Sequence, residues 1–156
     1  MTYREIIFSG ILDCFVELDY NTELCSIRFL QGKERLKETI TKMESIELDE
    51  YFKGKRKDFS CEMDISRLPA FSRKVLNETQ KISYGTTITY SELADRIGSR
   101  AVRAVGGALS NNPFPVLIPC HRVVAKSGIG GYSSGVDIKT RLLEFEKNRS
   151  ITFNSS

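Results

Sequence analysis

The N-terminal third of the chain alternates short β-prone runs with polar turns. The runs predict three strands, at residues 3–7, 14–18 and 24–29. Gly10 and the cluster at 19–21 mark the turns, so hairpins are expected. Residues 32–44 carry Leu36 and Ile40 at helical spacing, which predicts a helix. This third therefore reads as a small hairpin-rich sheet with one helix, and it holds no recognisable chemical motif.

A junction near residues 64–69 precedes a change to short helices and turns. Residues 71–82 have apolar side chains on one side of a predicted helix. The chain is therefore expected to have an α+β fold in two domains. Residues 1–66 form a small α/β domain, and residues 67–156 form a mostly helical one.

Two further short helices are predicted next. Thr89 and Glu92 fit a capping box, in which each side chain satisfies a free backbone donor of the other, so a helix should span 90–97. A glycine then breaks the helix, and Ser99 can cap a second helix that runs to about Leu109. Two short helices joined by a tight glycine turn make a helix-turn-helix.

The second of these helices has almost no bulky side chains. Gly106 and Gly107 stand together inside it, each costing about 1 kcal/mol relative to alanine. Such a helix invites the close approach of another surface. That surface is either a neighbouring helix or a nucleic-acid groove, and Arg100 and Arg103 favour the groove.

The most distinctive segment runs from residue 111 to 124. Three of the four prolines of the chain fall within seven residues of it, namely Pro113, Pro115 and Pro119. Proline fixes φ and lacks a backbone donor, so a regular helix or central strand is excluded. Residues 116–118 are apolar and predicted to be buried. The segment is therefore expected to be a stiff support that delivers Cys120 to a fixed place.

The C-terminal part combines a glycine-rich loop with a last helix. Residues 127–135 should form a loop whose backbone can approach a ligand closely. A helix is predicted at 137–148, capped by Asp137, with an apolar stripe of Ile138, Leu142 and Phe145. Glu146 is expected at the border of that stripe.

Composition and charge limit the function classes. Of the 156 residues, 40% are hydrophobic and 28% are charged, which is ordinary globular composition. Neither a membrane helix nor a secretory signal is predicted, so a cytoplasmic location is expected. Residues 1–67 hold 11 Lys and Arg against 14 Asp and Glu, a net −3, whereas residues 68–156 hold 12 against 6, a net +6. The second half is thus the candidate for meeting a polyanion, although a solvated basic face is the commoner meaning. The basic run 53–57 is expected to be a solvated loop.

Cys120 is the candidate nucleophile. His121 follows it directly and is the only histidine, hence the base available near neutral pH. Glu146 could orient the imidazole and stabilise its positive form, and Arg122 would add positive potential. The remaining cysteines have no such surroundings and are expected to be core residues or ordinary thiols: Cys14, Cys25 and Cys61. With these four cysteines and one histidine, no zinc site is predicted, and the thiols are expected to be reduced.

Three functions remain open on these residues alone. The first is a thiol hydrolase with a cysteine–histidine pair. The second is a thiol that accepts a group permanently. The third is not enzymatic and is a helix-turn-helix DNA-binding protein.

Ile118–Val123, IPCHRV, resembles the signature of the O(6)-alkylguanine-DNA alkyltransferase family, the methylated-DNA–protein-cysteine methyltransferases. The resemblance runs from about Ile82 to Glu146. It includes, in order, TYSELA at 89–94, RAVGGAL at 103–109, NPFPVLIPCHRVV at 112–124 and GGYSSG at 130–135. It implies a ribonuclease-H-like N-terminal domain, then a helical domain with a helix-turn-helix.

The resemblance also implies a DNA repair activity, the transfer of an alkyl group from O(6)-alkylguanine in DNA to the protein's own cysteine, once and irreversibly. Cys120 matches the alkyl acceptor. His121 matches the residue that deprotonates it through a water, and Glu146 matches the partner of that histidine. Asn112 matches an asparagine that ties the recognition helix to the active-site segment. Tyr90 matches a tyrosine that aids nucleotide rotation and hydrogen-bonds the flipped purine.

The resemblance also implies which residues contact DNA and the guanine base. Arg103 matches the finger that fills the vacated base stack. The minor groove would be met by residues of the turn and the second helix: Ser99, Arg100, Ala104, Gly106 and Gly107. The carbonyls of Cys120 and Val123 would face the exocyclic amine, and Tyr132 and Ser133 match the loop that closes over the guanine. The expected partner is double-stranded DNA bearing alkylated guanine, bound by a monomer without cofactor or metal.

Overall fold

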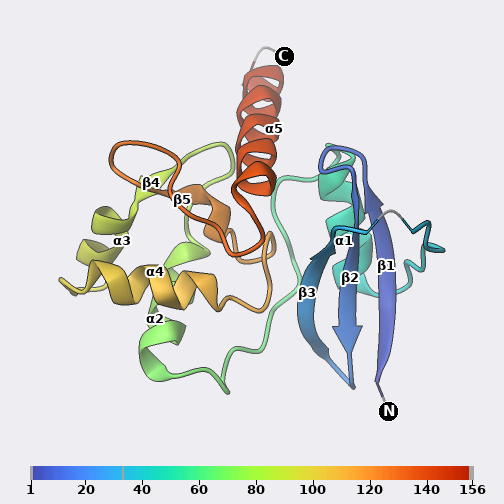
Figure 1. Cartoon of the computed structure of the whole chain (residues 1–156), viewed down its shortest axis with the longest axis horizontal. Coiled ribbons are helices and arrows are strands. Elements are labelled where there is room, and N and C mark those ends of the chain that lie inside the picture. Colours follow the sequence, from blue (N-terminus) through green and yellow to red (C-terminus); the bar gives the residue numbers. More distant parts are fainter. Residues whose placement is uncertain (1, 33, 155–156) are drawn as a thin grey trace. The chain divides into compact units, whose positions relative to one another are not determined.

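The computed structural model describes residues 2–32 and 34–154, with side chains up to residue 149. The chain separates into two compact units, Met1–Asp64 and Ile65–Ser156 (Figure 1). The first is a sheet with one helix, and the second is mostly helical. The expected α+β class is therefore confirmed. No helix in the described ranges is long and apolar enough to cross a membrane.

The first unit is an antiparallel sheet in the order β1-β2-β3. Its strands are β1 (Tyr3–Ser9), β2 (Cys14–Tyr20) and β3 (Leu24–Leu30), each one or two residues longer than predicted. The register pairs Ile7 with Val16 and Leu18 with Ile27. All four of these side chains are buried, so the period-2 pattern sets the core face of the sheet.

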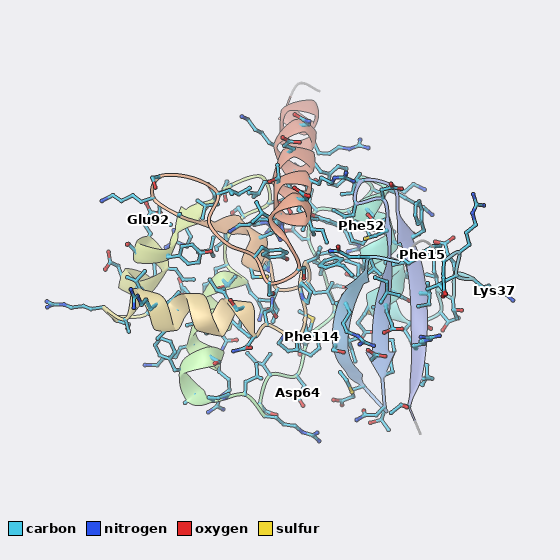
Figure 2. The ribbon with its side chains drawn as sticks, viewed as in Figure 1. Phe15, Lys37, Phe52, Asp64, Glu92 and Phe114 are labelled. Carbon is cyan, nitrogen blue, oxygen red and sulfur yellow. The ribbon has the colours of Figure 1, made fainter. Side chains whose placement is uncertain are left out.

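The helix predicted at 32–44 is wrong. The described part of this stretch has no helix before Met43, and Thr39 exchanges two backbone hydrogen bonds with Ile6 of β1, at 2.8 and 3.2 Å. Lys37, in the same segment, extends into solvent (Figure 2). Pairing with a strand edge thus outweighs the weak local helical spacing. Lys33 lies outside the described residues.

Helix α1 (Met43–Phe52) begins next to a carboxylate of β1 that binds the two residues before the helix. The buried Glu5 accepts the backbone N–H groups of Thr41 and Lys42, each at 3.1 Å, and the hydroxyl of Ser45. Burial raises the pKa of Glu5, but these hydrogen bonds prevail and hold it below its usual value. A residue 37 positions before Lys42 in sequence therefore fixes the backbone that leads into the helix.

The second unit holds the predicted helix-turn-helix. Helix α2 (Ala70–Thr79) is followed by strand β4 (Ile88–Thr89), helix α3 (Tyr90–Arg96) and helix α4 (Val102–Ser110). The Thr89–Glu92 capping box is present, as predicted. Gly98 has φ +71° in the turn between α3 and α4. Beyond them lie the 3₁₀ turn η1 (Cys120–Arg122), strand β5 (Val123–Val124) and helix α5 (Val136–Asn154).

The predicted ends of three helices are wrong. Helix α2 stops at Thr79 rather than Ile82. Ser99 does not cap α4, since its Oγ accepts the Ala101 N–H at 3.0 Å and the helix begins three residues later. Asp137 lies inside the first turn of α5, which begins at Val136 and continues beyond residue 148. Each shift is of a few residues, because capping preferences locate an end only approximately.

Candidate active site

The proline-rich segment folds back on itself before Cys120. The Asn112 side chain donates to the Ile118 carbonyl and accepts the Phe114 N–H, both at 2.9 Å. The Phe114 side chain is buried (Figure 2), as are residues 116–118, which confirms their predicted burial. Val116 has φ +73°, which is strained for a β-branched residue. The segment is therefore held rigidly, with Asn112 linking it to the end of α4.

A two-residue parallel pairing brings Tyr90 to this segment. Ile88 pairs with Val123 and Thr89 with Val124, directly after the Cys120–Arg122 turn. Helix α3 begins at Tyr90, immediately after β4. The tyrosine hydroxyl donates to the Gly131 carbonyl at 3.3 Å. The helix-turn-helix and the cysteine segment thus share one short sheet.

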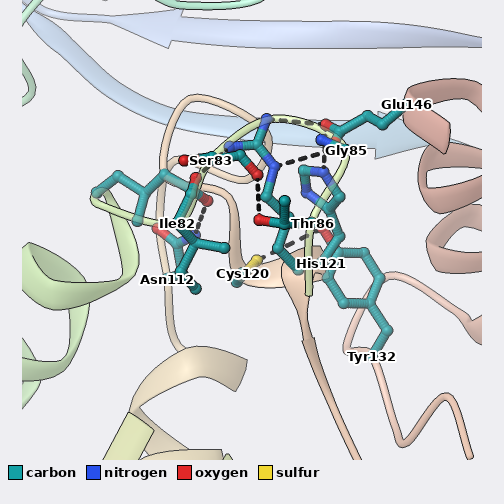
Figure 3. Close-up of polar contacts among 11 residues, drawn as sticks. Ile82, Ser83, Gly85, Thr86, Asn112, Cys120, His121, Tyr132 and Glu146 are labelled. Carbon is teal, nitrogen blue, oxygen red and sulfur yellow. Dashed lines mark hydrogen bonds and ion pairs between the residues drawn. The ribbon is translucent and has the colours of Figure 1, made fainter. Parts of the chain in front are cut away.

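The Cys120 thiol is only 6% exposed and lies 3.5 Å from the Tyr132 hydroxyl (Figure 3). Burial raises the pKa of this thiol. Hydrogen bonding with Tyr132 and Asn112 and the charge of Lys139 lower the pKa of the thiol without cancelling the effect of burial. The thiol therefore rests protonated and needs a base before it can act as a nucleophile.

His121 is a buried base, and one of its two ring nitrogens is already hydrogen-bonded to Glu146. Its Nε2 lies 2.8 Å from Oε2 of Glu146, and neither side chain is more than 1% exposed (Figure 3). Burial lowers the pKa of His121 more than the Glu146 charge raises it, so the imidazole is neutral. Nε2 then carries the proton donated to the carboxylate. Nδ1 is buried without a hydrogen-bond partner among the described residues, which leaves its lone pair free to accept a proton.

The observed role of Arg122 differs from the predicted one. Its Nε and Nη2 donate to the two oxygens of Glu146, at 2.8 and 2.9 Å, and Nη1 donates to the Ile82 carbonyl at 2.7 Å. Burial raises the pKa of Glu146, but His121 and Arg122 together hold it well below its usual range. Arg122 thus fixes the carboxylate rather than acting on the thiol, and Glu146 is fully buried rather than at a border.

Lys139 is a site residue that sequence reasoning missed. Its side chain is completely buried, and Nζ donates to the Gly131 carbonyl at 3.0 Å and to the Tyr90 hydroxyl at 3.4 Å. The sequence spacing could have identified Lys139, because residues 139 and 146 are seven apart and so share one helix face. Gly130, at φ +77°, allows this packing, since a Cβ there would lie 3.0 Å from the Tyr90 ring.

The predicted DNA-contacting residues lie outside the buried site. Arg100, Arg103, Ala104 and Gly107 are exposed, whereas Ser99 and Gly106 are half-buried. A Cβ added at Gly106 or Gly107 would meet no described atom within 4 Å. Close packing against a neighbouring helix therefore does not explain this glycine pair. Ser133 is exposed on the loop, whereas Val123 is buried beside the cysteine turn.

The second unit thus defines a class of protein: a helix-turn-helix domain that carries a buried thiol beside a histidine–carboxylate pair. A family model described as the DNA-binding domain of 6-O-methylguanine DNA methyltransferase matches residues 70–148. The chain belongs to this family.

Individual relatives agree with that assignment. Methylated-DNA–protein-cysteine methyltransferases of Metallosphaera sedula and Sulfolobus acidocaldarius are 48% and 45% identical over 99 and 98 residues. These matches cover 64% and 63% of this chain, and they span 63% and 62% of those proteins. The Mycobacterium tuberculosis O6-methylguanine methyltransferase has a similar structure, with TM-score 0.82 and 33% identity over 96% of this chain and 94% of that one. A structure of the M. tuberculosis protein in complex with DNA has TM-score 0.79 at 32% identity, over 94% and 93% of the two chains.

Proposed function

We propose that this protein repairs alkylated guanine in DNA by transferring the alkyl group to Cys120 in a single irreversible reaction. The observation that carries the proposal is the Cys120 thiol, held in a helix-turn-helix unit beside the 2.8 Å His121–Glu146 pair. Relatives named as methylated-DNA–protein-cysteine methyltransferases support it.

The transfer begins with loss of the thiol proton. His121 accepts it through a water at Nδ1, since Nε2 is committed to Glu146. The buried carboxylate then stabilises the imidazolium that forms. The thiolate attacks the alkyl carbon, an S–C bond forms, and the C–O bond to the purine breaks. The electron pair stays on the purine, where the Tyr90 hydroxyl, turned away from the Gly131 carbonyl, donates a hydrogen bond to the developing charge. The purine then takes up a proton from water.

The base must leave the duplex before it reaches the thiol. Unstacking and unpairing require a few kcal/mol. Arg103 filling the vacated stack and basic contacts to phosphate would offset that energy. The small residues suit a close fit to the minor groove, since Ala104 and Gly107 are exposed and Gly106 is half-buried, with Ser99 and Arg100 beside them.

The flipped guanine would then be held from two sides. The carbonyls of Cys120 and Val123 face its exocyclic amine, and Tyr132 and Ser133 close the loop over it. Asn112 keeps the cysteine segment aligned with the recognition helix. No cofactor is needed for this chemistry, and because nothing in the mechanism cleaves the thioether, each molecule reacts once.

The intact mass of the protein tests this function. After incubation with an oligonucleotide containing O(6)-methylguanine, we expect a gain of one methyl group, mapped to Cys120, in one stoichiometric burst. Cys120→Ala and an unmodified oligonucleotide are the controls, and both should give no gain.

Two other outcomes would replace the proposal. Product release beyond one equivalent would indicate a thiol hydrolase. DNA binding that is unchanged in Cys120→Ala, with no mass gain in the native protein, would indicate a non-enzymatic helix-turn-helix DNA-binding protein.

A further inference from the structure

Lys139 is a buried cation with no anionic partner among the residues that the structure describes. Its side chain is 0% exposed, and no carboxylate of the described residues forms an ion pair with it. Its contacts are the Gly131 carbonyl at 3.0 Å, the Tyr90 hydroxyl at 3.4 Å, and the rings of Tyr90 and Tyr132 at 5.5 and 6.0 Å. The ammonium is therefore solvated only by neutral groups.

Such an arrangement disfavours the folded state. Burying an ammonium takes it out of water, and neutral dipoles and aromatic faces recover only part of that free energy. Burial accordingly lowers the pKa of Lys139 to about 8. An apolar side chain of the same length would be more stable in this place, so a functional reason for the charge is indicated.

The thiol of Cys120 is the group nearby that can become an anion. Tyr132 connects the two, because its hydroxyl lies 3.5 Å from Sγ and its ring lies under the ammonium. The interaction is mutual, since the Lys139 charge lowers the pKa of Cys120 and the thiol raises that of Lys139.

The other titratable groups around Lys139 do not fill this role. Burial raises the pKa of Tyr90, on α3, so it stays neutral. His121, on η1, is neutral at rest, and a second positive charge there disfavours its protonation. Glu146, on the same helix as Lys139, already pairs with His121 and Arg122.

We propose that Lys139 is a positioning residue for the alkyl transfer, whose ammonium is the counter-charge of the Cys120 thiolate and holds Tyr90 and Gly131 in place around the substrate base. The positioning of Tyr90 and Gly131 around the substrate base rests on the proposed function. The counter-charge role of Lys139 concerns the Cys120 thiol alone.

Lys139→Met removes the charge and keeps the length of the side chain, and Lys139→Arg keeps the charge. Lys147→Met is the matched control, since Lys147 is exposed on the same helix. The readout is the rate at which iodoacetamide alkylates Cys120 between pH 6 and 10, followed by peptide mass spectrometry. Cys25, which is exposed, is the internal reference in every sample.

In Lys139→Met we expect the pKa of Cys120 to rise by about one pH unit, so that alkylation at neutral pH slows about tenfold. Lys139→Arg should restore most of the rate, while Lys147→Met and the Cys25 rate should match the native protein. An unchanged pH profile of Cys120 in Lys139→Met would overturn the inference.

Thermal unfolding separates this role from a structural one. Lys139→Met is expected to unfold at the same or a higher temperature than the native protein, because it no longer buries a charge. A large loss of stability with an unchanged thiol profile would mean that Lys139 only supports the fold. Lys139→Gln, which keeps a donor for Gly131, gives the same comparison if the methionine variant does not fold.

A parallel assay with the methylguanine oligonucleotide distinguishes the two proposals. If both hold, transfer slows in Lys139→Met in proportion to its lost thiolate. If the native protein transfers nothing while the thiol pKa still shifts in the variant, the proposed function fails and the electrostatic role of Lys139 stands. If the native protein and Lys139→Met transfer equally fast at every pH, the inference about Lys139 fails and the proposed function stands.

Discussion

Glu146 shows how one residue can set the state of a whole site. Its two oxygens accept hydrogen bonds from His121, from two nitrogens of Arg122 and from the Gly85 N–H. These partners hold the pKa of Glu146 below its usual value against the effect of burial. A depressed carboxylate pKa contributes stability that is complete above the unfolded value of about 4.3 and is lost as the pH falls below it.

Glu146→Gln should lower the free energy of unfolding at pH 7 by about 3–5 kcal/mol, because it leaves the buried Arg122 without its counter-charge. The difference from the native protein should shrink below about pH 4, where the unfolded native chain takes up a proton at Glu146. Urea unfolding followed by circular dichroism at pH 7 and pH 3 measures both. Glu144→Gln, exposed on the same helix, should have little effect, and an equally large loss there would contradict this explanation.

At the scale of elements, helix α4 separates its packing face from an open face of small residues. Val105, Ala108 and Leu109 are buried, whereas Arg103, Ala104 and Gly107 are exposed. These three buried side chains thus hold the helix against the interior of its unit. The remaining face is available to a surface outside the chain.

Arg103→Ala should slow repair of duplex DNA by roughly tenfold or more, since even 1.4 kcal/mol of the energy needed for base flipping accounts for that factor. Reaction with free O(6)-methylguanine should change little, because no duplex has to be opened. Single-turnover rates on the two substrates measure the contrast. An equal loss on both would show that Arg103 has no role in opening the duplex.

At the scale of the whole molecule, the sulfur of the candidate nucleophile Cys120 lies in the packed interior of its unit. Cys120 is 6% exposed, and the residues before and after it in the same segment, Ile118 and Val123, are fully buried. Interiors of this kind tolerate added volume poorly. The product of the proposed reaction should therefore be less stable than the unreacted protein.

Methylation of Cys120 should lower the free energy of unfolding by about 1–3 kcal/mol through overpacking. Urea unfolding of the protein before and after reaction, with protein incubated with unmodified duplex as the control, measures the change. Amide exchange in α5, which carries Lys139 and Glu146, should quicken in the methylated form. Equal unfolding curves would mean that the site accommodates the methyl group without strain.

Features set by neighbouring residues were predicted well from the sequence. The three strands follow the alternation of their side chains, and the Thr89–Glu92 capping box depends on contacts three residues apart. The adjacency of Cys120 and His121 was read directly from the chain. The helix predicted at 32–44 failed because a strand edge and the distant Glu5 decide that region.

The sequence by itself determined the local elements and which side chains carry chemistry, because those depend on residue type and short spacing. Only the tertiary structure decided how the charges pair. Arg122 fixes Glu146, and Lys139 is buried between two tyrosines, through contacts that join positions 24 and 49 apart. Short spacings in the sequence cannot predict such contacts. They depend on how separate elements pack and on which buried polar groups have lost their contact with water.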